Sequence, residues 1–178
     1  MKRKMTGKQI AEYGLLIALA MVLSYVEFLI PFSVAVPGVK LGLANIVVVF
    51  ALYRLGKTEA FVISILRVLL MTFMFGNAFA LFYSLSGAIL SFAAMLLLLK
   101  TKRFSHIGVG ISGGVFHNIG QILCAMVLLG TKQIAYYLPV LLVSGTIAGI
   151  AIGVIAGILI NRLKPGGAAK NSSRKEKK

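Results

Sequence analysis

The sequence predicts an all-α membrane protein, a compact bundle of six transmembrane helices. Apolar residues make up 59% of the 178 residues, and the mean hydropathy is +0.96. Charged residues make up 13%, against roughly 25% in an average soluble domain. The apolar residues also fall into six long runs. These three observations exclude a disordered chain and an ordinary water-soluble domain.

A helix that crosses the bilayer needs about 20 predominantly apolar residues. The six expected spans are Ile10–Ile30, Leu41–Leu55, Glu59–Phe75, Ala78–Leu99, Ile107–Leu129 and Ile134–Leu163. The second and third spans are short, so we expect them to tilt or to thin the bilayer locally. Only Gly76 and Asn77 separate the third span from the fourth, which fits either a tight outer turn or a bend in a helix that does not fully cross.

The first span needs to be distinguished from a secretory signal peptide, because basic residues precede it and Ser33-Val34-Ala35 follows it. The apolar run is longer than the ~7–15 residues of a signal h-region. We therefore expect this segment to be retained as the first helix.

The basic residues predict the orientation. With six spans, both termini lie on the side of the membrane that carries sixteen of the nineteen Lys and Arg residues, whereas the other side carries Lys40 and Lys132. The positive-inside rule places the basic side in the cytoplasm. A net charge of +15 would otherwise suggest nucleic acid, but this distribution makes it a topology signal, and we expect no nucleic-acid partner.

The chain is expected to form one integral membrane domain, residues 1–163, followed by a flexible basic tail, residues 164–178. Electrostatic attraction to anionic membrane lipid explains the charge of this tail.

Polar residues inside the spans define the candidate site, because intramembrane polar groups are costly and by default mark function. At ~1.5 Å per residue, they fall at mid-membrane or in the outer half of the bilayer. The predicted ligand-binding residues are Glu27, Lys40, Asn45, Arg67, Asn77, His117, Asn118 and Gln121. Their shared depth predicts a pocket that opens outward.

Arg67 lies near the middle of its span, and a guanidinium there needs an anionic partner, which favours a role beyond packing. Glu27 fits a pairing with Arg67 or with Lys40, or contact with a cationic group of a ligand. Asn45 and Asn118 fit interhelical hydrogen bonding, worth about 0.6–2 kcal/mol, as well as they fit ligand binding.

The fifth span brings His117 and Gln121 onto one helical face, because they are four residues apart. Asn118 is about 100° away and also fits a bond to a neighbouring helix. Between the first two spans, the Pro- and Gly-containing segment Pro31–Gly42 has several apolar side chains. It fits either a lid over the pocket or a loop in the membrane interface.

Two patterns of small residues allow close approach between helix backbones. The last span has a glycine at every fourth position from Gly145 to Gly157, and the first span has a weaker pattern. Packing inside the bundle and docking against another membrane subunit both explain them. The candidate docking residues are Gly145, Gly149, Gly153 and Gly157, and Ala11, Gly14 and Ala18.

Catalytic motifs are missing from the sequence: it has no phosphate-binding Walker motif, no zinc-protease motif and no nucleophile elbow. Its four acidic residues are all Glu, whereas Mg²⁺-dependent diphosphate chemistry usually needs clustered carboxylates. Cys124, the one cysteine, fits a packing role. We therefore expect no catalytic residue, no metal and no cofactor, and we expect that active transport would need partners or an ion gradient.

Two segments carry a family resemblance: PGVKLGLANIVVVFAL at Pro37–Leu52 and SGGVFHNIGQ at Ser112–Gln121. They resemble the Gx transporter family, also labelled heptaprenyl diphosphate synthase component I. The likeness covers roughly residues 10–160, including Arg67 and the segment Ser84–Gly87. The motif residues it carries over are Lys40, Asn45, Arg67, His117, Asn118 and Gln121.

This family is similar to the substrate-binding S components of energy-coupling-factor vitamin transporters. The resemblance implies an S-component-like bundle of six helices in a bacterial cytoplasmic membrane, with an outward pocket capped by the first loop. It also implies docking, through Ala11, Gly14 and Ala18, on a coupling subunit driven by two cytoplasmic ATPases. The synthase label implies instead a non-catalytic partner of a prenyl synthase catalytic subunit.

Three functions follow as hypotheses. The leading one is a membrane substrate-binding subunit for uptake of a small anionic or amphipathic metabolite. The alternative is a non-catalytic accessory subunit in isoprenoid or quinone metabolism. A self-contained carrier is the third, although the sequence shows no inverted repeat.

Overall fold

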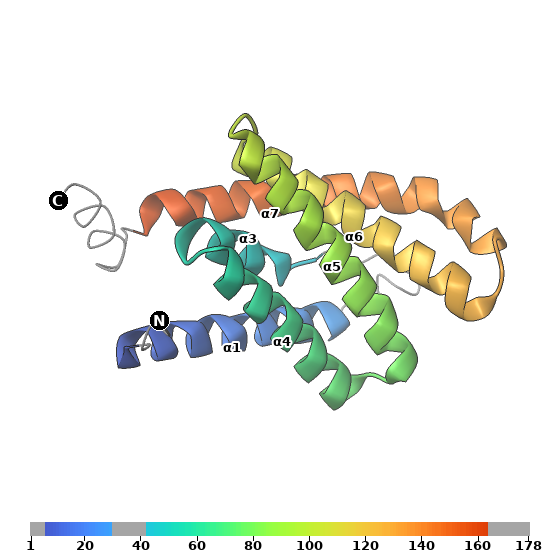
Figure 1. The fold of residues 1–178 in the computed structure, drawn as a ribbon, viewed down its shortest axis with the longest axis horizontal. Coiled ribbons are helices and arrows are strands. Elements are labelled where there is room, and N and C mark those ends of the chain that lie inside the picture. The colour runs from blue at the N-terminus through green and yellow to red at the C-terminus, as the bar shows by residue number, and fades with distance from the viewer. Residues whose placement is uncertain (1–5, 30–41, 164–178) are drawn as a thin grey trace.

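The computed structural model describes residues 6–29 and 42–163, and every regular element in these ranges is a helix (Figure 1). The all-α fold predicted from the sequence is therefore confirmed. The elements are α1 (Gly7–Leu29), α3 (Asn45–Arg54), α4 (Lys57–Phe75), α5 (Ala78–Thr101), α6 (His106–Leu129), the 3₁₀ helix η1 (Gln133–Tyr137) and α7 (Leu138–Arg162).

Five of the described helical segments are long and apolar enough to cross a membrane: α1, α4, α5, α6 and the continuous segment Gln133–Arg162. The chain is accordingly a multi-pass membrane protein. The expected second span is wrong in its length, because α3 has only 10 residues. At ~1.5 Å per residue it extends about 15 Å, half of a ~30 Å hydrocarbon core.

A turn explains the late start of α3. Gly42 has a φ of +69°, in the left-handed region that favours glycine, and residues 43 and 44 continue the turn before the helix begins. Hydropathy does not detect this turn, because it consists of Gly, Leu and Ala. All side chains from Ile46 to Leu52 are buried, and α3 packs against α1, α4, α6 and α7. The short helix is therefore the centre of the core.

The join between α4 and α5 is a tight turn rather than a bend within one helix. α4 ends at Phe75 and α5 begins at Ala78, with Asn77 as the N-cap. Asn77 Oδ1 accepts a hydrogen bond from the Ala80 N–H at 2.8 Å. This bond satisfies one of the donors that every helix leaves free at its start.

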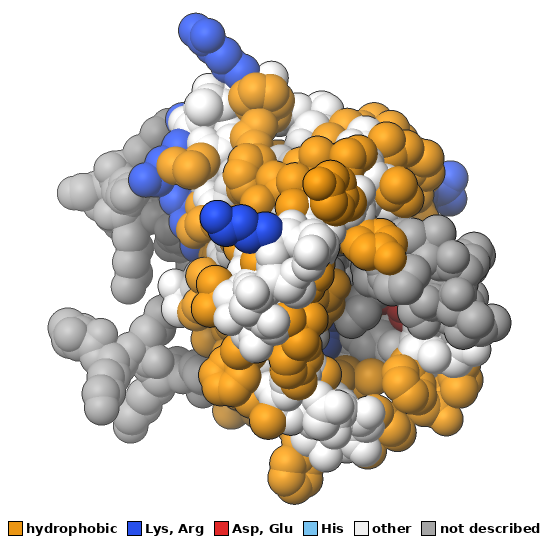
Figure 2. Space-filling model, turned by 90° about the vertical axis from the view of Figure 1, so that its right-hand side faces the viewer, with side chains coloured by type: hydrophobic (Ala, Val, Ile, Leu, Met, Phe, Trp, Pro, Cys, Tyr) orange, Lys and Arg blue, Asp and Glu red, His pale blue; other side chains and the backbone are white. Residues whose placement is uncertain are grey.

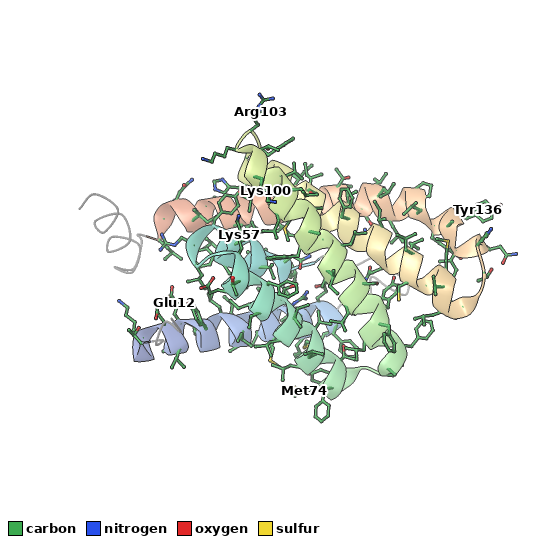
Figure 3. The ribbon with its side chains drawn as sticks, viewed as in Figure 1. Glu12, Lys57, Met74, Lys100, Arg103 and Tyr136 are labelled. Atoms are coloured by element: carbon green, nitrogen blue, oxygen red, sulfur yellow. The ribbon has the colours of Figure 1, made fainter. Side chains whose placement is uncertain are left out.

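The two ends of the bundle differ in charge. α1 begins, α3 ends, α4 begins and α7 ends on the left of Figure 1, whereas the α4–α5 and α6–η1 connections lie on the opposite side. Lys57, Lys100 and Arg103 lie toward the first end and Tyr136 at the other (Figure 3). This is the distribution that the predicted orientation needs, and the cytoplasmic placement of the basic end stays a prediction.

Hydrophobic side chains cover much of the opposite end (Figure 2). Phe73 of α4 and Tyr136 of η1 are 91% and 84% exposed. Exposed aromatic side chains at the end of a membrane bundle suit the interface between lipid and water, where Tyr is enriched.

Glycines bring α6 and α7 into backbone contact. A Cβ at Gly149 would lie 2.5 Å from Ile111 Cα, and a Cβ at Gly153 would lie 2.5 Å from Ile107 Cα. A Cβ at Gly145 would lie 2.9 Å from Gly114 O. Real Cβ atoms do not approach other atoms this closely, so only glycine fits these positions.

The glycines of α7 are therefore not a docking surface for another subunit. Gly145, Gly149, Gly153 and Gly157 are all buried inside the bundle. Of the two interpretations of this ridge, the structure shows internal packing. The small residues of α1 differ, because Ala11, Gly14 and Ala18 are exposed and a Cβ at Gly14 would meet no atom within 4 Å.

A similar contact joins α6 to α5. A Cβ at Gly120 would lie 2.7 Å from Ser86 O, and Ser86 Oγ donates a hydrogen bond to Gly120 O at 2.9 Å. Gly87 lies next to them against α6. α6 is thus held on two sides by backbone contacts.

Replacing Gly149 with Ala tests the α6–α7 contact. We expect Gly149→Ala to destabilise the protein by about 1–3 kcal/mol, because the added methyl group meets backbone that cannot move aside. The measurement is the midpoint of thermal and SDS-induced unfolding in detergent.

Gly14→Ala is the matched control. It adds the same methyl group to an exposed position of α1, where we expect no loss of stability and a gain of up to about 1 kcal/mol from helix propensity. Equal destabilisation by the two substitutions would contradict the packing argument.

Candidate functional site

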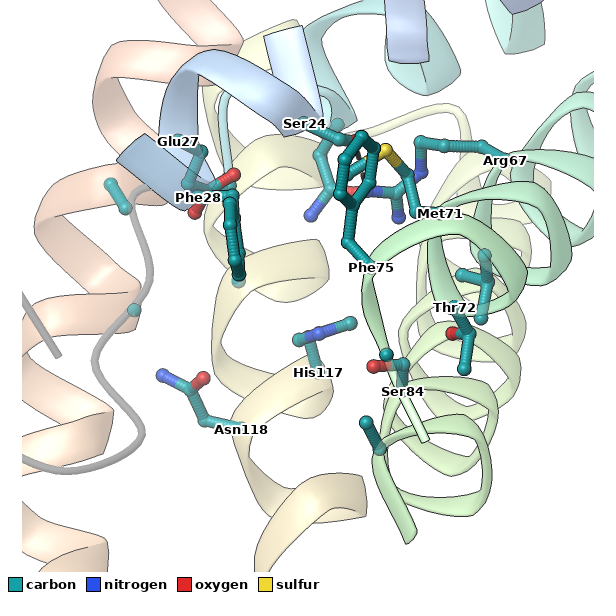
Figure 4. A pocket seen from close by; sticks show the side chains of 18 of the residues that line it. Ser24, Glu27, Phe28, Arg67, Met71, Thr72, Phe75, Ser84, His117 and Asn118 are labelled. Atoms are coloured by element: carbon teal, nitrogen blue, oxygen red, sulfur yellow. Dashed lines mark hydrogen bonds between the residues drawn. The ribbon is translucent and has the colours of Figure 1, made fainter. Parts of the chain in front are cut away.

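The structure contains a cavity of about 390 Å³ lined by residues of α1, α3, α4, α5, α6 and α7. This volume lies in the ~300–1,000 Å³ range typical of small-molecule sites. Its polar lining residues are Ser24, Glu27, Asn45, Arg67, Thr72, Ser84, His117 and Asn118. The larger apolar ones are Phe28, Val68, Met71, Phe75 and Ile152. Figure 4 shows these side chains converging from several helices.

Arg67 supplies the basic group of the described lining. It lies near the middle of α4, where the buried residues Ile63 and Ser64 precede it by one turn, so it shares the inward face of the helix. Arg67 Nη1 donates a hydrogen bond to Ser24 Oγ of α1 at 3.2 Å. Its buried Nε has no hydrogen-bond partner among the described residues. Because Nε is buried, donors for a bound molecule have to come from the terminal nitrogens of the guanidinium, which carries five N–H groups in all.

Glu27 supplies the acidic group. Its Oε1 accepts a hydrogen bond from the Gly42 N–H at 2.6 Å, which ties the end of α1 to the turn before α3. Glu27 also interacts electrostatically with Arg67. Of the partners considered from the sequence, Lys40 lies outside the described residues.

Asn45 is the first residue of α3, so the short helix begins at the wall of the cavity. On α6, His117 and Asn118 both line the cavity. Asn118 Nδ2 also donates to Leu141 O of α7 at 2.5 Å. Asn118 thus makes the interhelical bond that one interpretation anticipated, and it borders the cavity as well.

Two of the seven predicted site residues that the structure describes do not line the cavity. Asn77 is exposed and caps α5. Gln121 is fully buried, and its Cγ would lie 2.9 Å from a Cβ on Gly87, which places it in the α5–α6 contact instead. Lys40 falls outside the described residues.

Sequence reasoning did not select several lining residues. Met71 and Phe75 follow Arg67 by four and eight residues, so helical spacing alone places them on its face. Ser24 precedes Glu27 by three residues and is found in the same way. Thr72 and Ser84 carry no comparable signal, because hydroxyl residues are common in membrane helices.

Aromatic rings join the ends of α1 and α4 beside the cavity. The ring centroids of Phe28 and Phe75 are 5.8 Å apart, and those of Tyr25 and Phe75 are 5.2 Å apart. Figure 4 shows Phe28 and Phe75 reaching into the space above His117. These rings provide an apolar wall close to Glu27.

The described residues hold no group of three or more His, Cys, Asp or Glu side chains that could bind a metal ion. The described lining offers hydrogen bonds, charge and apolar contact to a bound molecule.

The family model described as heptaprenyl diphosphate synthase component I matches residues 16–159, which is most of the chain. No curated protein and no solved structure matches the chain.

Replacing Gln121 tests whether its buried amide lowers the stability of the protein. Both amide atoms are buried without a hydrogen-bond partner among the described residues. A buried amide without a partner destabilises the folded state, because it has lost its hydration and gained no hydrogen bond. We therefore expect Gln121→Met to raise stability by about 1–3 kcal/mol. The measurement is the unfolding midpoint in detergent.

Asn118→Leu is the matched control. It removes the amide that donates a hydrogen bond to Leu141 O of α7, so we expect a loss of about 1–2 kcal/mol. A loss of stability in Gln121→Met would show that the Gln121 amide has a partner in the membrane.

Proposed function

The chain belongs to the heptaprenyl diphosphate synthase component I family, and from this premise we propose that it is a membrane subunit that binds a small anionic or amphipathic metabolite for uptake. The observation that carries the proposal is the cavity of about 390 Å³ with the Arg67 guanidinium in its wall. A charged group inside a membrane bundle is costly, so its retention favours a role in recognition.

The composition of the lining supports binding rather than catalysis. The described lining contains one Arg, one Glu and one His, together with amide, hydroxyl and aromatic side chains. A few polar groups in a mostly apolar cavity give orientation and specificity to a bound molecule. The chain therefore acts as a binding subunit, and any chemistry belongs to a partner.

The proposed membrane placement supports uptake. With the basic end in the cytoplasm, the aromatic ends of α1 and α4 face outward, and so does the part of the cavity that they border. Transport against a gradient then needs an energy source outside this chain. We include in the proposal a transmembrane coupling subunit and cytoplasmic ATPases in a bacterial cytoplasmic membrane. The exposed small residues Ala11, Gly14 and Ala18 of α1 provide a surface for such a partner.

A second candidate function is a non-catalytic accessory subunit of a heptaprenyl diphosphate synthase. The family description favours it more directly than it favours uptake. The catalytic subunit would be the partner, because this sequence has no Asp and only four acidic residues. Its role would be to hold the synthase or its lipid product at the membrane.

Ligand binding predicts a dependence on Arg67. We expect fractions of a bacterial metabolite extract to raise the melting temperature of the purified wild-type protein but not of Arg67→Ala, because the variant lacks the charged donor in the cavity. Arg103→Ala, which removes an exposed Arg from the α5–α6 connection, is the matched control and should respond like wild type. Equal responses of wild type and Arg67→Ala to every fraction would refute the role of this pocket.

Affinity purification of the full-length protein from its native membrane separates the two candidates. Under the uptake proposal, a membrane coupling subunit and ATPases co-purify with it. Recovery of a prenyl synthase without ATPases would favour the accessory role instead. Replacing Ala11, Gly14 and Ala18 with Leu in one triple variant should release the coupling subunit, because the larger side chains would stand on the surface proposed to contact it.

A further inference from the structure

The charges around the cavity constrain the kind of molecule that fits it. The described lining carries one positive group, Arg67, and one negative group, Glu27, and these two interact electrostatically. The formal charge of this wall is therefore zero when His117 is neutral. A ligand with several negative charges would meet the Glu27 carboxylate as well as the Arg67 guanidinium, in a region where unpaired charge is costly.

We propose that the cavity binds a net-neutral zwitterion with an aromatic or other apolar body. The anionic group of the ligand lies at Arg67 and Ser24, and its cationic group lies at Glu27, Phe28 and Phe75. This inference rests on the proposed binding function and narrows its ligand from an anionic or amphipathic metabolite to an amphipathic zwitterion.

The anionic end is built for a carboxylate or a similar group. Arg67 Nη1 bonds Ser24 Oγ at 3.2 Å, while Nε is buried without a partner in the described part of the chain. Because Ser24 Oγ accepts from Arg67, its own O–H remains a donor. The terminal N–H groups of the guanidinium and this hydroxyl are the donors for one anionic group, and charge-assisted bonds of this kind are the strong ones.

The cationic end combines a carboxylate with aromatic faces. The Gly42 N–H occupies Glu27 Oε1, and this bond holds the carboxylate in place at the end of α1. A carboxylate has a second oxygen, which suits an ammonium group. Phe28 and Phe75 lie beside it with ring centroids 5.8 Å apart, and a cation within about 6 Å of a ring face gains further attraction.

The remaining wall suits an apolar body. Met71 of α4 and Ile152 of α7 also line the cavity. A methionine side chain adapts to irregular shapes and contacts aromatic rings favourably. The two charges therefore set the orientation of the ligand, and the apolar wall accepts its body.

Matched probes that differ only in charge test this inference. The probes are L-phenylalanine and L-tryptophan as zwitterions, 3-phenylpropionate and indole-3-propionate as anions, phenethylamine and tryptamine as cations, and dimethylallyl diphosphate as a multiply charged anion. The full-length protein in lipid nanodiscs is equilibrated with the mixture, and retained compounds are quantified by mass spectrometry. We expect at least tenfold greater retention of a zwitterion than of either of its singly charged analogues.

Substitutions at Glu27 and Arg67 assign the two ends. Glu27→Gln keeps an oxygen that accepts from the Gly42 N–H but loses the charge, so the ammonium group of the probe should no longer increase retention. Arg67→Gln should abolish the contribution of the carboxylate, and Arg67→Lys should restore part of it. Glu12→Gln, on the exposed surface of α1, is the matched control and should retain the probes like wild type.

The outcomes separate this inference from the proposed function. Preferential retention of an anion or of the diphosphate by wild type overturns the zwitterion assignment and leaves a binding subunit. Retention of none of the probes, together with stabilisation by a metabolite fraction, overturns the zwitterion assignment too. Failure of both the probes and every metabolite fraction removes the binding function itself.

Discussion

The close approach of α6 to its two neighbours is the contact on which the rest of the structure depends. Glycines on α6 and α7 let the two backbones touch, and Gly120 with Ser86 makes the equivalent contact to α5. In a bilayer the hydrophobic effect does not drive helices together, so tight packing and interhelical hydrogen bonds must do so. These contacts make α5, α6 and α7 a three-helix wall. The α7 glycines are buried within this wall against α6, so they are not available to another subunit.

The cavity follows from placing a short helix against this wall. α3 fills the core for 10 residues and begins at Asn45, so the space beyond its first residue is left to side chains from α1, α4 and α6. Helices α1 and α4 close the space with Arg67, Ser24 and aromatic rings. Rigid packing on one side and a short helix on the other thus produce a small-molecule cavity within a bundle of ordinary membrane helices.

The fold was predictable because long apolar runs in the sequence indicate membrane-spanning helices. Most of the cavity's polar residues were predictable because polar side chains are rare within such runs. The length of α3 was not, since the turn at Gly42 is made of residues as apolar as the helix that follows. Asn77 and Gln121 show another limit: an amide side chain serves equally as a helix cap, a buried packing residue or a ligand contact. The α7 glycines predicted a close neighbour, but the identity of that neighbour depends on the tertiary structure.

The position of Arg67 has a consequence for biogenesis. A guanidinium at the centre of a membrane helix makes insertion of that helix less favourable by about 2.5–3.5 kcal/mol. α1 precedes α4 in the chain, so Ser24 and Glu27 are synthesised before the helix that needs them. If α1 remains beside the translocation machinery, it offers Arg67 a hydrogen-bond acceptor and an opposite charge as α4 enters the lipid. The order of the helices along the chain would then lower the cost of inserting a charge that the finished cavity uses.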